Sequence, residues 1–439
     1  MWPKRCSTGA ASRGREAGRR HDNDPVSSTP TNAYDRRFVG WLSLGQLISW
    51  GSIFYMFALV MEPVEQELGL GRAEASLGFS LALMAEGLLA YPVGRWIDRG
   101  HERAVMTGGS LLVVAGMVLL SMAQSAAGFW LAWLCLGAAM SATLYAPSFA
   151  VVTRRFPQDF RRAIITLTFL GGLASTVFIP LTSWLITQVG WRHALWALAL
   201  IHLLVCVPLH WIVLRRHKPS QTVQATTAAR DTATAGSSVA PAGQLQPLSH
   251  YLRSAPFLLI GVFVVLMMAI TSALPAHMIS LLRENGLGEA WVIVIPASIG
   301  VIQVLGRALL YFFEHHFDVH MANRIIPCLI PLGLAALLAG GGHGWAAVLF
   351  VGLYGMGNGM MTIVKGTAIA QYVNRQHVAS LNGALGLPLA FARALAPLLL
   401  GVLWSRDAGY RYGLWLMLVS AIVAVVALLM AQRRALPTG

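Results

Sequence analysis

The chain has 439 residues, of which 56% are hydrophobic and only 11% are charged, and its mean hydropathy is +0.62. About a quarter of the residues of a soluble domain are charged, so this composition excludes an ordinary soluble enzyme and predicts a polytopic membrane protein. In a soluble protein the net charge of +14 would suggest a nucleic acid partner. We expect none here, because membrane topology accounts for the positive charge.

Residues 1–37 are polar and rich in Arg, Ser, Gly and Pro, without the apolar stretch of a secretory signal, and we expect a disordered cytoplasmic tail. From residue 38 the chain shows apolar runs of about 20 residues, which as helices can cross a hydrocarbon core of about 30 Å. No strand-like alternation is present, so the pattern predicts an all-α protein rather than a barrel. The twelve predicted spans are 38–61, 75–95, 104–123, 127–152, 163–187, 193–215, 255–280, 289–309, 322–340, 344–365, 379–404 and 412–432.

A polar segment, 216–252, separates the sixth span from the seventh and contains QTVQATTAARDTATAGSSVAPAGQLQP. Stretches rich in Ala, Thr, Ser and Gly, without large apolar residues, are typical of flexible linkers. The sequence therefore predicts an N-terminal six-helix bundle over 38–215, a flexible cytoplasmic linker over 216–252 and a C-terminal six-helix bundle over 253–434.

The positive residues also predict the orientation, because Lys and Arg gather on the cytoplasmic side of a membrane. With the N-terminus inside, 26 of the 32 Lys and Arg residues fall on the cytoplasmic side, five fall outside, and Arg393 lies within a span. The first outside turn is acidic, with Glu62, Glu65, Glu67 and Glu74. Both termini are therefore predicted to be cytoplasmic.

The two predicted halves repeat short motifs in the same order. The segment VMEPVEQELGLG at 60–71 corresponds to HMISLLRENGLG at 277–288, an offset of 217 residues. Parallel repeats of this kind are typical of transporters, in which the substrate site lies near the midplane between the repeats. Three further pairs match: Gly94-Arg95 with Gly306-Arg307, Gly190-Trp191-Arg192 with Gly409-Tyr410-Arg411, and Pro180 with Pro397.

The cysteines and one histidine-rich segment could suggest a redox or metal site, but both patterns have simpler structural explanations. The four cysteines (Cys6, Cys135, Cys206, Cys328) have no CxxC spacing, and three lie in apolar runs as small core residues. The segment EHHFDVH at 314–320 is rich in potential ligands but lies in a short connector after the eighth span, where a solvated polar loop is favoured. We find no motif for hydrolysis or ATP coupling and expect no metal and no cofactor.

Residues 94–103 read GRWIDRGHER and resemble the loop signature of the major facilitator superfamily, approximately GxxxDRxGxR. Gly94, Asp98, Arg99 and Arg103 match, and a His at position 101 stands where the family usually has Gly. The resemblance covers residues 38–434 and implies twelve transmembrane helices in two pseudo-repeat halves. The family's loop residues are implied to control the conformational change.

Shorter motifs are similar to those of bacterial carriers of the monocarboxylate and oxalate/formate branch: YAPSFAVVTRRF at 145–156, GWR at 190–192 and GNGMMTIVKG at 357–366. Lys365 occupies the family's usual basic position in the last motif, and Arg307 is a second basic residue at a cytoplasmic span end. The resemblance also implies that spans one, four, seven and ten line a central cavity. The cavity-lining candidates, with Gln303 added from span eight, are Gln46, Trp50, Tyr55, Tyr145, Thr271, His277, Tyr354 and Asn358.

Two ionisable residues lie near the centre of a predicted span, where a charge costs about 2.5–3.5 kcal/mol and marks a functional candidate. Glu86 lies nine residues, or about 13 Å, inside span two, and Arg393 lies near the middle of span eleven. Since the resembling fold places these spans opposite each other, we expect a Glu86–Arg393 contact or a shared polar network. The pair could couple transport to protons, Arg393 could hold a substrate carboxylate, or the contact could be static.

The sequence therefore predicts a secondary active transporter of the inner plasma membrane that works by alternating access and is driven by a proton or solute gradient. A small organic anion such as a monocarboxylate is the first substrate class, and the protein is expected to act as a monomer in the bilayer. His277, near the outer end of span seven, is a candidate gate or proton-linked residue. The alternatives are a drug/proton efflux antiporter and, from another class, a non-transporting membrane sensor or scaffold.

Overall fold

The structure is a computed structural model that describes residues 35–156, 159–215, 248–312, 319–340, 343–374 and 378–435. Most of the predicted tail, most of the predicted linker and the potential metal ligands at positions 314–318 lie outside these residues. The chain divides into two units, Met1–Ala33 and Tyr34–Gly439, and the second unit is described below.

The N-terminal bundle consists of helices that follow one another closely along the chain. Its first helix begins at Arg36 because the Asp35 carboxylate accepts hydrogen bonds from the backbone N–H groups of Arg37 and Phe38. The elements are α1 (Arg36–Ser49), η1 (Trp50–Tyr55), α2 (Met56–Leu68), α3 (Arg72–Trp96), η2 (Ile97–His101), α4 (Glu102–Ser121), α5 (Ala126–Thr143), α6 (Tyr145–Arg155), α7 (Phe160–Gly172), α8 (Ala174–Ile201), η3 (His202–Cys206) and α9 (Val207–Val213).

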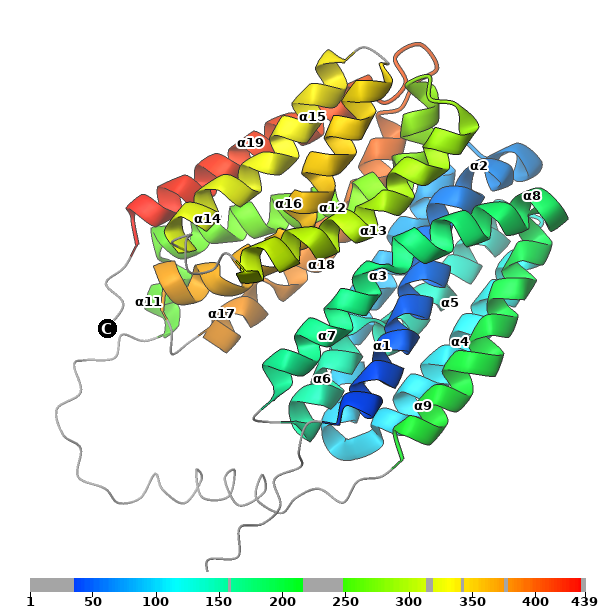
Figure 1. Cartoon of the computed structure of the whole chain (residues 1–439), viewed down its shortest axis with the longest axis horizontal. Coiled ribbons are helices and arrows are strands. Elements are labelled where there is room, and N and C mark those ends of the chain that lie inside the picture. The colour runs from blue at the N-terminus through cyan, green and yellow to red at the C-terminus, as the bar shows by residue number, and fades with distance from the viewer. Residues whose placement is uncertain are drawn as a thin grey trace, which may run out of the picture. The chain divides into compact units, whose positions relative to one another are not determined.

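Helices connected by turns also make up the described part of the C-terminal bundle, which in addition has one isolated backbone bridge between Ser405 and Gly409. Figure 1 shows the two bundles side by side. The elements of the second bundle are α11 (Leu248–Leu252), α12 (Ala255–Glu284), α13 (Glu289–Phe312), α14 (Val319–Ile325), η5 (Ile326–Cys328), α15 (Leu329–Ala339), α16 (Gly344–Tyr372), α17 (Val378–Ala384), α18 (Gly386–Val402) and α19 (Arg411–Arg433).

Every one of the twelve predicted spans corresponds to a described helical segment. Nine stretches of the described residues are long and apolar enough to cross a membrane, and Arg72–Ser121 and Arg162–Val213 each contain a chain reversal. The reversals occur at Gly100 (φ 85°) and Gly190 (φ 77°), in the left-handed region that glycine adopts without steric cost. In the loop motif, therefore, Gly100 makes the turn. It lies one residue before position 101, where the family usually has Gly and this chain has His.

The backbone confirms two of the sequence repeats. Gly69 (φ 65°) and Gly286 (φ 79°) are separated by the offset of 217 residues and both end a helix in the left-handed conformation. Gly190 and Gly409 (φ 53°) also have a positive φ in the matching GWR and GYR motifs, although the ψ of Gly190 is 161° and that of Gly69 is 28°. The two halves therefore have a glycine of positive φ at both pairs of corresponding positions.

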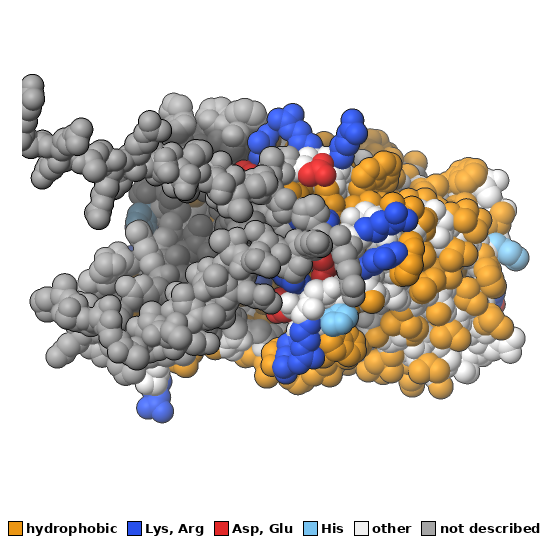
Figure 2. Space-filling view, turned by 90° about the horizontal axis from the view of Figure 1, so that it is seen from below, with side chains coloured by type: hydrophobic (Ala, Val, Ile, Leu, Met, Phe, Trp, Pro, Cys, Tyr) orange, Lys and Arg blue, Asp and Glu red, His pale blue; other side chains and the backbone are white. Residues whose placement is uncertain are grey.

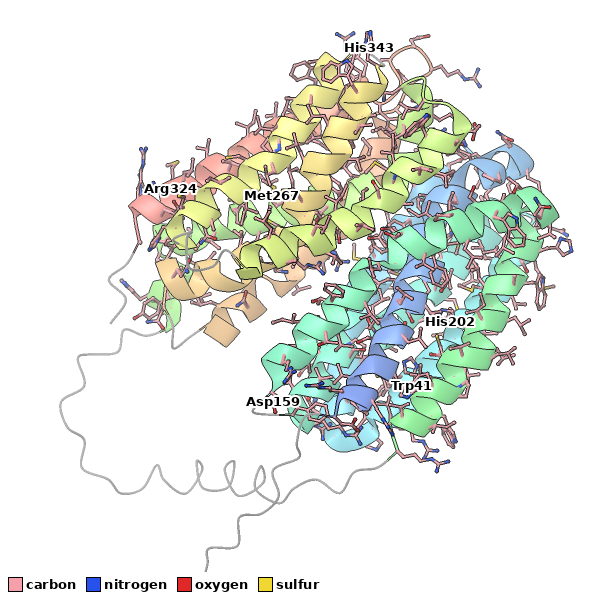
Figure 3. All side chains as sticks on the ribbon, viewed as in Figure 1. Trp41, Asp159, His202, Met267, Arg324 and His343 are labelled. Atoms are coloured by element: carbon pink, nitrogen blue, oxygen red, sulfur yellow. The ribbon has the colours of Figure 1, made fainter. Side chains whose placement is uncertain are left out.

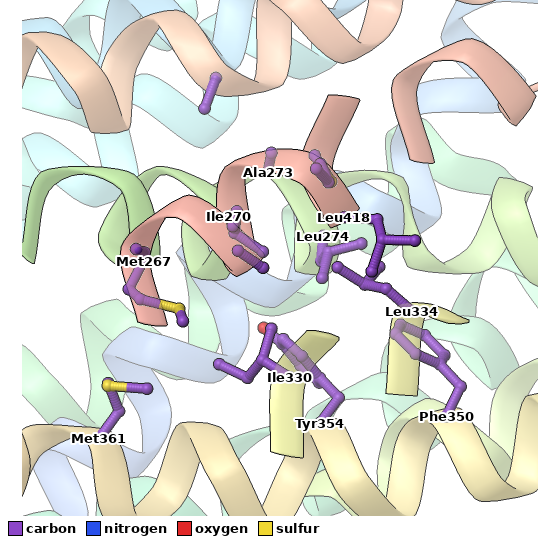
Figure 4. Close-up of a cluster of buried hydrophobic side chains, with 14 of the residues drawn as sticks. Met267, Ile270, Ala273, Leu274, Ile330, Leu334, Phe350, Tyr354, Met361 and Leu418 are labelled. Carbon is purple, nitrogen blue, oxygen red and sulfur yellow. The ribbon is translucent and has the colours of Figure 1, made fainter. Parts of the chain in front are cut away.

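Each bundle has its own apolar core, and its outer surface is also apolar, as lipid requires. Figure 4 shows part of the C-terminal core, where Met267, Ile270 and Leu274 of α12 face Ile330 of α15 and Tyr354 of α16. Figure 2 shows a broad hydrophobic surface, with Lys and Arg side chains gathered toward one end. Figure 3 shows all the described side chains, with His343 at one end of the helices and Asp159 at the other.

The bundles meet mainly where α3 packs against α18 and α8 against α13, with smaller contacts of α2 with α12 and of α7 with α13. We call the end that holds the α2–α3 turn and the α18–α19 loop the latch end, and the end where α1 begins and α19 stops the termini end. Among the described residues, hydrogen bonds and ion pairs join the bundles from the latch end down to Glu86 and Arg307.

Candidate functional site

The most unusual charge between the bundles belongs to Arg307, on α13. Its guanidinium donates to two backbone carbonyl oxygens: Nη1 to Thr168 of the N-terminal bundle at 2.6 Å, and Nε to Gly359 of α16 at 3.0 Å. No carboxylate of the described residues lies within ion-pair distance of this guanidinium. Arg307 is therefore a half-buried cation between the bundles, near the termini end of the predicted span 289–309, whose charge no acidic neighbour in the described chain neutralises.

Aromatic side chains of the N-terminal bundle face this cation. The hydroxyl groups of Tyr55 and Tyr145 are both close enough to interact electrostatically with Arg307. The Tyr145 ring stacks against Trp50, with 4.8 Å between the ring centroids, and an added Cβ at Gly171 would lie 2.4 Å from the Tyr145 hydroxyl. Trp50 and Tyr55 belong to η1, a π-helical turn, an irregularity that occurs frequently at functional sites.

A small space between the bundles lies one helical turn from Arg307 toward the latch end. Its volume is about 10 Å³, room for about one water molecule or a methyl group. Both bundles contribute to its walls, which are mostly apolar. The lining residues are Tyr55, Ala58, Ile179, Pro275, Met278, Ile279, Pro296, Ile299, Gln303, Tyr354 and Asn358.

The Glu86–Arg393 contact expected from the sequence is present. Arg393 Nη2 donates to Glu86 Oε2 at 3.3 Å, and Arg393 Nε donates to Ser272 Oγ of α12 at 3.3 Å. The two charged side chains are only 23% and 16% exposed. Lys365 of α16 lies near enough to Arg393 for their positive charges to repel each other, so the neighbourhood holds two cations and one anion.

A second polar network joins the bundles at the latch end. We call its five residues, Glu65, Arg72, His277, Glu284 and Tyr410, the latch. Arg72 Nη1 donates to the Tyr410 hydroxyl at 2.6 Å, and that hydroxyl lies 2.9 Å from His277 Nδ1. Arg72 also forms ion pairs with Glu65, at 2.8 Å, and with Glu284 of the other bundle, at 3.7 Å.

Further contacts surround the latch. His277 Nε2 lies 3.0 Å from the Pro397 carbonyl oxygen and 3.3 Å from Ser76 Oγ. Arg283 of α12 forms an ion pair with Glu62 of α2 across the interface, and another with Glu289 of its own bundle at 2.9 Å. The latch end is therefore closed by charged contacts as well as by apolar packing.

Several of the other predicted site residues lie away from the interface. The Gln46 amide is fully buried and donates to the Thr143 carbonyl and to Ser148 Oγ, so its hydrogen bonds lie inside the N-terminal bundle. The Thr271 hydroxyl donates to the Met268 carbonyl of its own helix. These bonds satisfy polar groups that would otherwise be unpaired within a helical bundle.

The loop motif lies at the termini end of the N-terminal bundle. Gly94 belongs to α3, and Asp98 and Arg99 are exposed in η2. The Arg103 guanidinium packs 3.4 Å from the centroid of the Trp211 ring. Asp98 has no hydrogen bond or ion pair among the described residues.

The chain matches the sequence profile of the Major Facilitator Superfamily over residues 42–318. The chain belongs to the major facilitator superfamily. This membership makes the protein a secondary transporter rather than an enzyme. It also confirms the predicted fold, an all-helical multi-pass membrane protein built from two parallel repeats.

Solved structures of this superfamily have the same fold. The nucleoside transporter NupG superimposes with a TM-score of 0.67 at 15% identity, covering 90% of this chain and 98% of that one. A bacterial homologue of the human lysosomal transporter Spinster, in an inward-facing and occupied conformation, also gives 0.67 at 15% identity, covering 93% of this chain and 98% of that one.

One curated relative matches part of the sequence. Monocarboxylate transporter 13 of Rattus norvegicus is 31% identical over 174 residues, which is 38% of this chain and 38% of that protein. This superfamily member therefore spans well under half the length of the relative it matches.

Proposed function

We propose that this transporter moves a small organic anion of the monocarboxylate type, and that Arg307 holds the carboxylate. The observation that carries the proposal is the position of Arg307 between the bundles without an acidic partner in the described chain. A half-buried cation between the bundles has lost part of its hydration, and a substrate anion would compensate for its charge during the transport cycle. The planar guanidinium is well suited to a carboxylate.

The surroundings of Arg307 agree with a short substrate. The hydroxyls of Tyr55 and Tyr145 could donate to the oxygens of the bound carboxylate. The apolar space next to them, of about 10 Å³, could admit a methyl group in this conformation. The 31% identical segment of a rat monocarboxylate transporter is further support for this substrate class.

The sequence alone favoured Arg393 for the substrate, and its contacts favour a different role. Because Arg393 already pairs with Glu86, a substrate carboxylate would have to compete with a carboxylate of the protein. We assign the pair to coupling: Glu86 would take up a proton when the two bundles separate and the cation moves away.

The same proposal includes the orientation and the location. The excess of Lys and Arg at the termini end favours a cytoplasmic position for that end, with the latch end outside and the protein in the plasma membrane. With this orientation the latch end, where charged contacts join the bundles, faces the cell exterior.

Binding to purified protein tests the substrate class. Acetate, lactate and pyruvate should raise the melting temperature of the wild-type protein, with a shift that grows with concentration by mass action. Arg307→Gln should abolish this shift, and Arg307→Lys, which keeps the charge but not the planar fork, should retain only part of it. Arg324→Gln is the matched control, because Arg324 is an arginine that bonds Gln432 away from the interface.

An unchanged response in Arg307→Gln would refute the assigned site. Stabilisation by lipophilic cations alone, without any response to carboxylates, would refute the substrate class and favour the drug/proton antiporter. Uptake of labelled lactate into proteoliposomes, driven by an inward proton gradient, then tests transport directly.

A further inference from the structure

The latch contains a chain of hydrogen bonds in which each donor can be assigned. Arg72 can only donate, so the Tyr410 oxygen accepts from it. The Pro397 carbonyl can only accept, so His277 Nε2 carries a hydrogen. In a neutral imidazole Nδ1 is then an acceptor, and it accepts the hydrogen of the Tyr410 hydroxyl.

The contact with Ser76 agrees with this assignment. The Ser76 hydroxyl donates to the Arg72 carbonyl at 2.6 Å, so its oxygen is free to accept from His277 Nε2–H at 3.3 Å. Burial raises the pKa of Tyr410, and the nearby Arg72 offsets this only in part, so the hydroxyl keeps its hydrogen at physiological pH. The direction of every hydrogen bond in the chain is therefore fixed in the closed latch.

The closed latch has no place for a second proton on His277. A hydrogen on Nδ1 would point at the hydroxyl hydrogen of Tyr410, and one of the two would lose its acceptor. The imidazolium would also be linked to the Arg72 guanidinium through a single oxygen atom. His277 is fully buried, so water cannot separate the two positive charges.

The contacts divide cleanly between the bundles. His277, Tyr410 and Glu284 belong to the C-terminal bundle, and Arg72 and Glu65 belong to the N-terminal bundle. Opening this end separates Arg72 from Tyr410 and leaves His277 with its neighbours of the same bundle. Glu284 and Tyr410 already line a surface hollow of about 810 Å³ at the latch end, so water lies close to the network.

We propose that His277 is a proton-binding site that controls the latch: the proton binds when the latch end is open, and the protonated imidazole prevents it from closing. An acidic solution at the latch end would hold the transporter open on that side. With the orientation proposed above this side is the cell exterior, but the proposal depends neither on the substrate nor on the orientation.

The other charged groups around His277 would respond to acid in the opposite way. Glu65 and Glu284 share the single cation Arg72 across the interface. A proton on either carboxylate would reduce the repulsion between them and favour closure. The neighbouring pair of Glu62 and Arg283 is an ion pair whose loss in acid would weaken the latch, so it needs its own control.

The distance between two spin labels at the latch end tests the proposal. The labels are placed at Gln124, in the α4–α5 loop, and at Trp345, near the start of α16, both exposed, in the full chain without its native cysteines. Double electron–electron resonance on protein in lipid nanodiscs then gives the ratio of open to closed molecules. An imidazole in water titrates near pH 6.5, so this ratio should rise about tenfold between pH 8 and pH 5.5.

The variants separate His277 from its neighbours. His277→Gln can still donate and accept one hydrogen bond, so the latch should close with little dependence on pH. Tyr410→Phe removes the hydroxyl that faces Nδ1 and should reduce the change in the open-to-closed ratio between pH 8 and pH 5.5 to less than threefold. This second variant keeps the test valid if His277→Gln does not fold. Glu62→Gln is the control, and its ratio of open to closed molecules should change with pH by the same factor as in the wild type.

Three results would overturn the proposal. One is a wild-type ratio that does not change with pH. The second is a shift toward closure in acid, which would identify the carboxylates Glu65 and Glu284 as the proton site. The third is a response that survives unchanged in His277→Gln. Carboxylate binding at Arg307 is measured separately, so failure of one proposal leaves the other standing.

Discussion

Arg393 and Glu86 form an ion pair at 3.3 Å although 307 residues separate them in the chain, and each belongs to a different bundle. Any motion that separates the bundles at this depth breaks the pair and exposes both charges to a new environment.

We expect Glu86→Gln to uncouple transport from protons. The variant cannot bind or release a proton, so uptake driven by a proton gradient should fall at least tenfold in proteoliposomes, while solute exchange without a gradient continues. Asp98→Asn, which changes an exposed carboxylate, is the control for charge removal. Gradient-driven uptake at the wild-type rate in Glu86→Gln would refute the coupling role.

The packing of α3 against α5 should tolerate no side chain at Gly137. An added Cβ would lie 2.2 Å from the Ala82 carbonyl oxygen, so Gly137→Ala should destabilise the protein by about 1–3 kcal/mol and lower its melting temperature. Gly108→Ala is the matched control, because nothing lies within 4 Å of its added Cβ. An equal melting temperature for the two variants would contradict this account of the interface.

The turn at the latch end should require glycine at position 69. Its φ of 65° costs a residue with a side chain about 1–2 kcal/mol, although no atom would clash with the added Cβ. Gly69→Ala should therefore lower the melting temperature. Gly71→Ala, where φ is −73°, should not. A larger loss in the Gly71 variant would show that the conformation of the turn is not what matters.

The two ion pairs of Arg283 should differ in effect. Only Glu62 crosses the interface, whereas Glu289 belongs to the same bundle as Arg283. Glu62→Gln should raise the fraction of molecules open at the latch end, and Glu289→Gln should leave it nearly unchanged. Exposed pairs contribute about 0.2–1 kcal/mol, so the expected change in the open-to-closed ratio is less than about sixfold. The spin-label distance measures both variants, and a reversed order would be inconsistent with the closed latch.

Hydropathy was sufficient to predict the helices, because lipid enforces long apolar runs and leaves few alternatives to a helix. The Glu86–Arg393 contact was also predictable, since a charge inside a span needs a partner and the fold of the resembling superfamily places these two spans opposite each other. The position of the Gln46 side chain was harder to predict. A polar residue in a span can face a cavity or form hydrogen bonds with a neighbouring helix, and only the packing decides between the two.

The latch could not be found from residue type alone. Arg72 and Tyr410 stand at span ends, where Arg and Tyr commonly anchor a helix at the membrane surface. The signal that was available is the repeat, since Tyr410 lies in the GYR motif that matches GWR. Similarly, the contacts of Arg307 between the bundles could not be predicted, because hydropathy does not show which way a long side chain points.

The repeat also explains how the two halves came to have different tasks at equivalent positions. Trp191 and Tyr410 both follow a left-handed glycine, but the Trp191 indole donates to Glu67 of its own bundle at 2.5 Å, whereas Tyr410 reaches Arg72 of the other bundle. Equivalent positions of the two halves therefore serve different ends, since Trp191 braces its own bundle and Tyr410 joins the two bundles. Tyr410→Trp would make the halves more alike and would remove the hydroxyl that links Arg72 to His277.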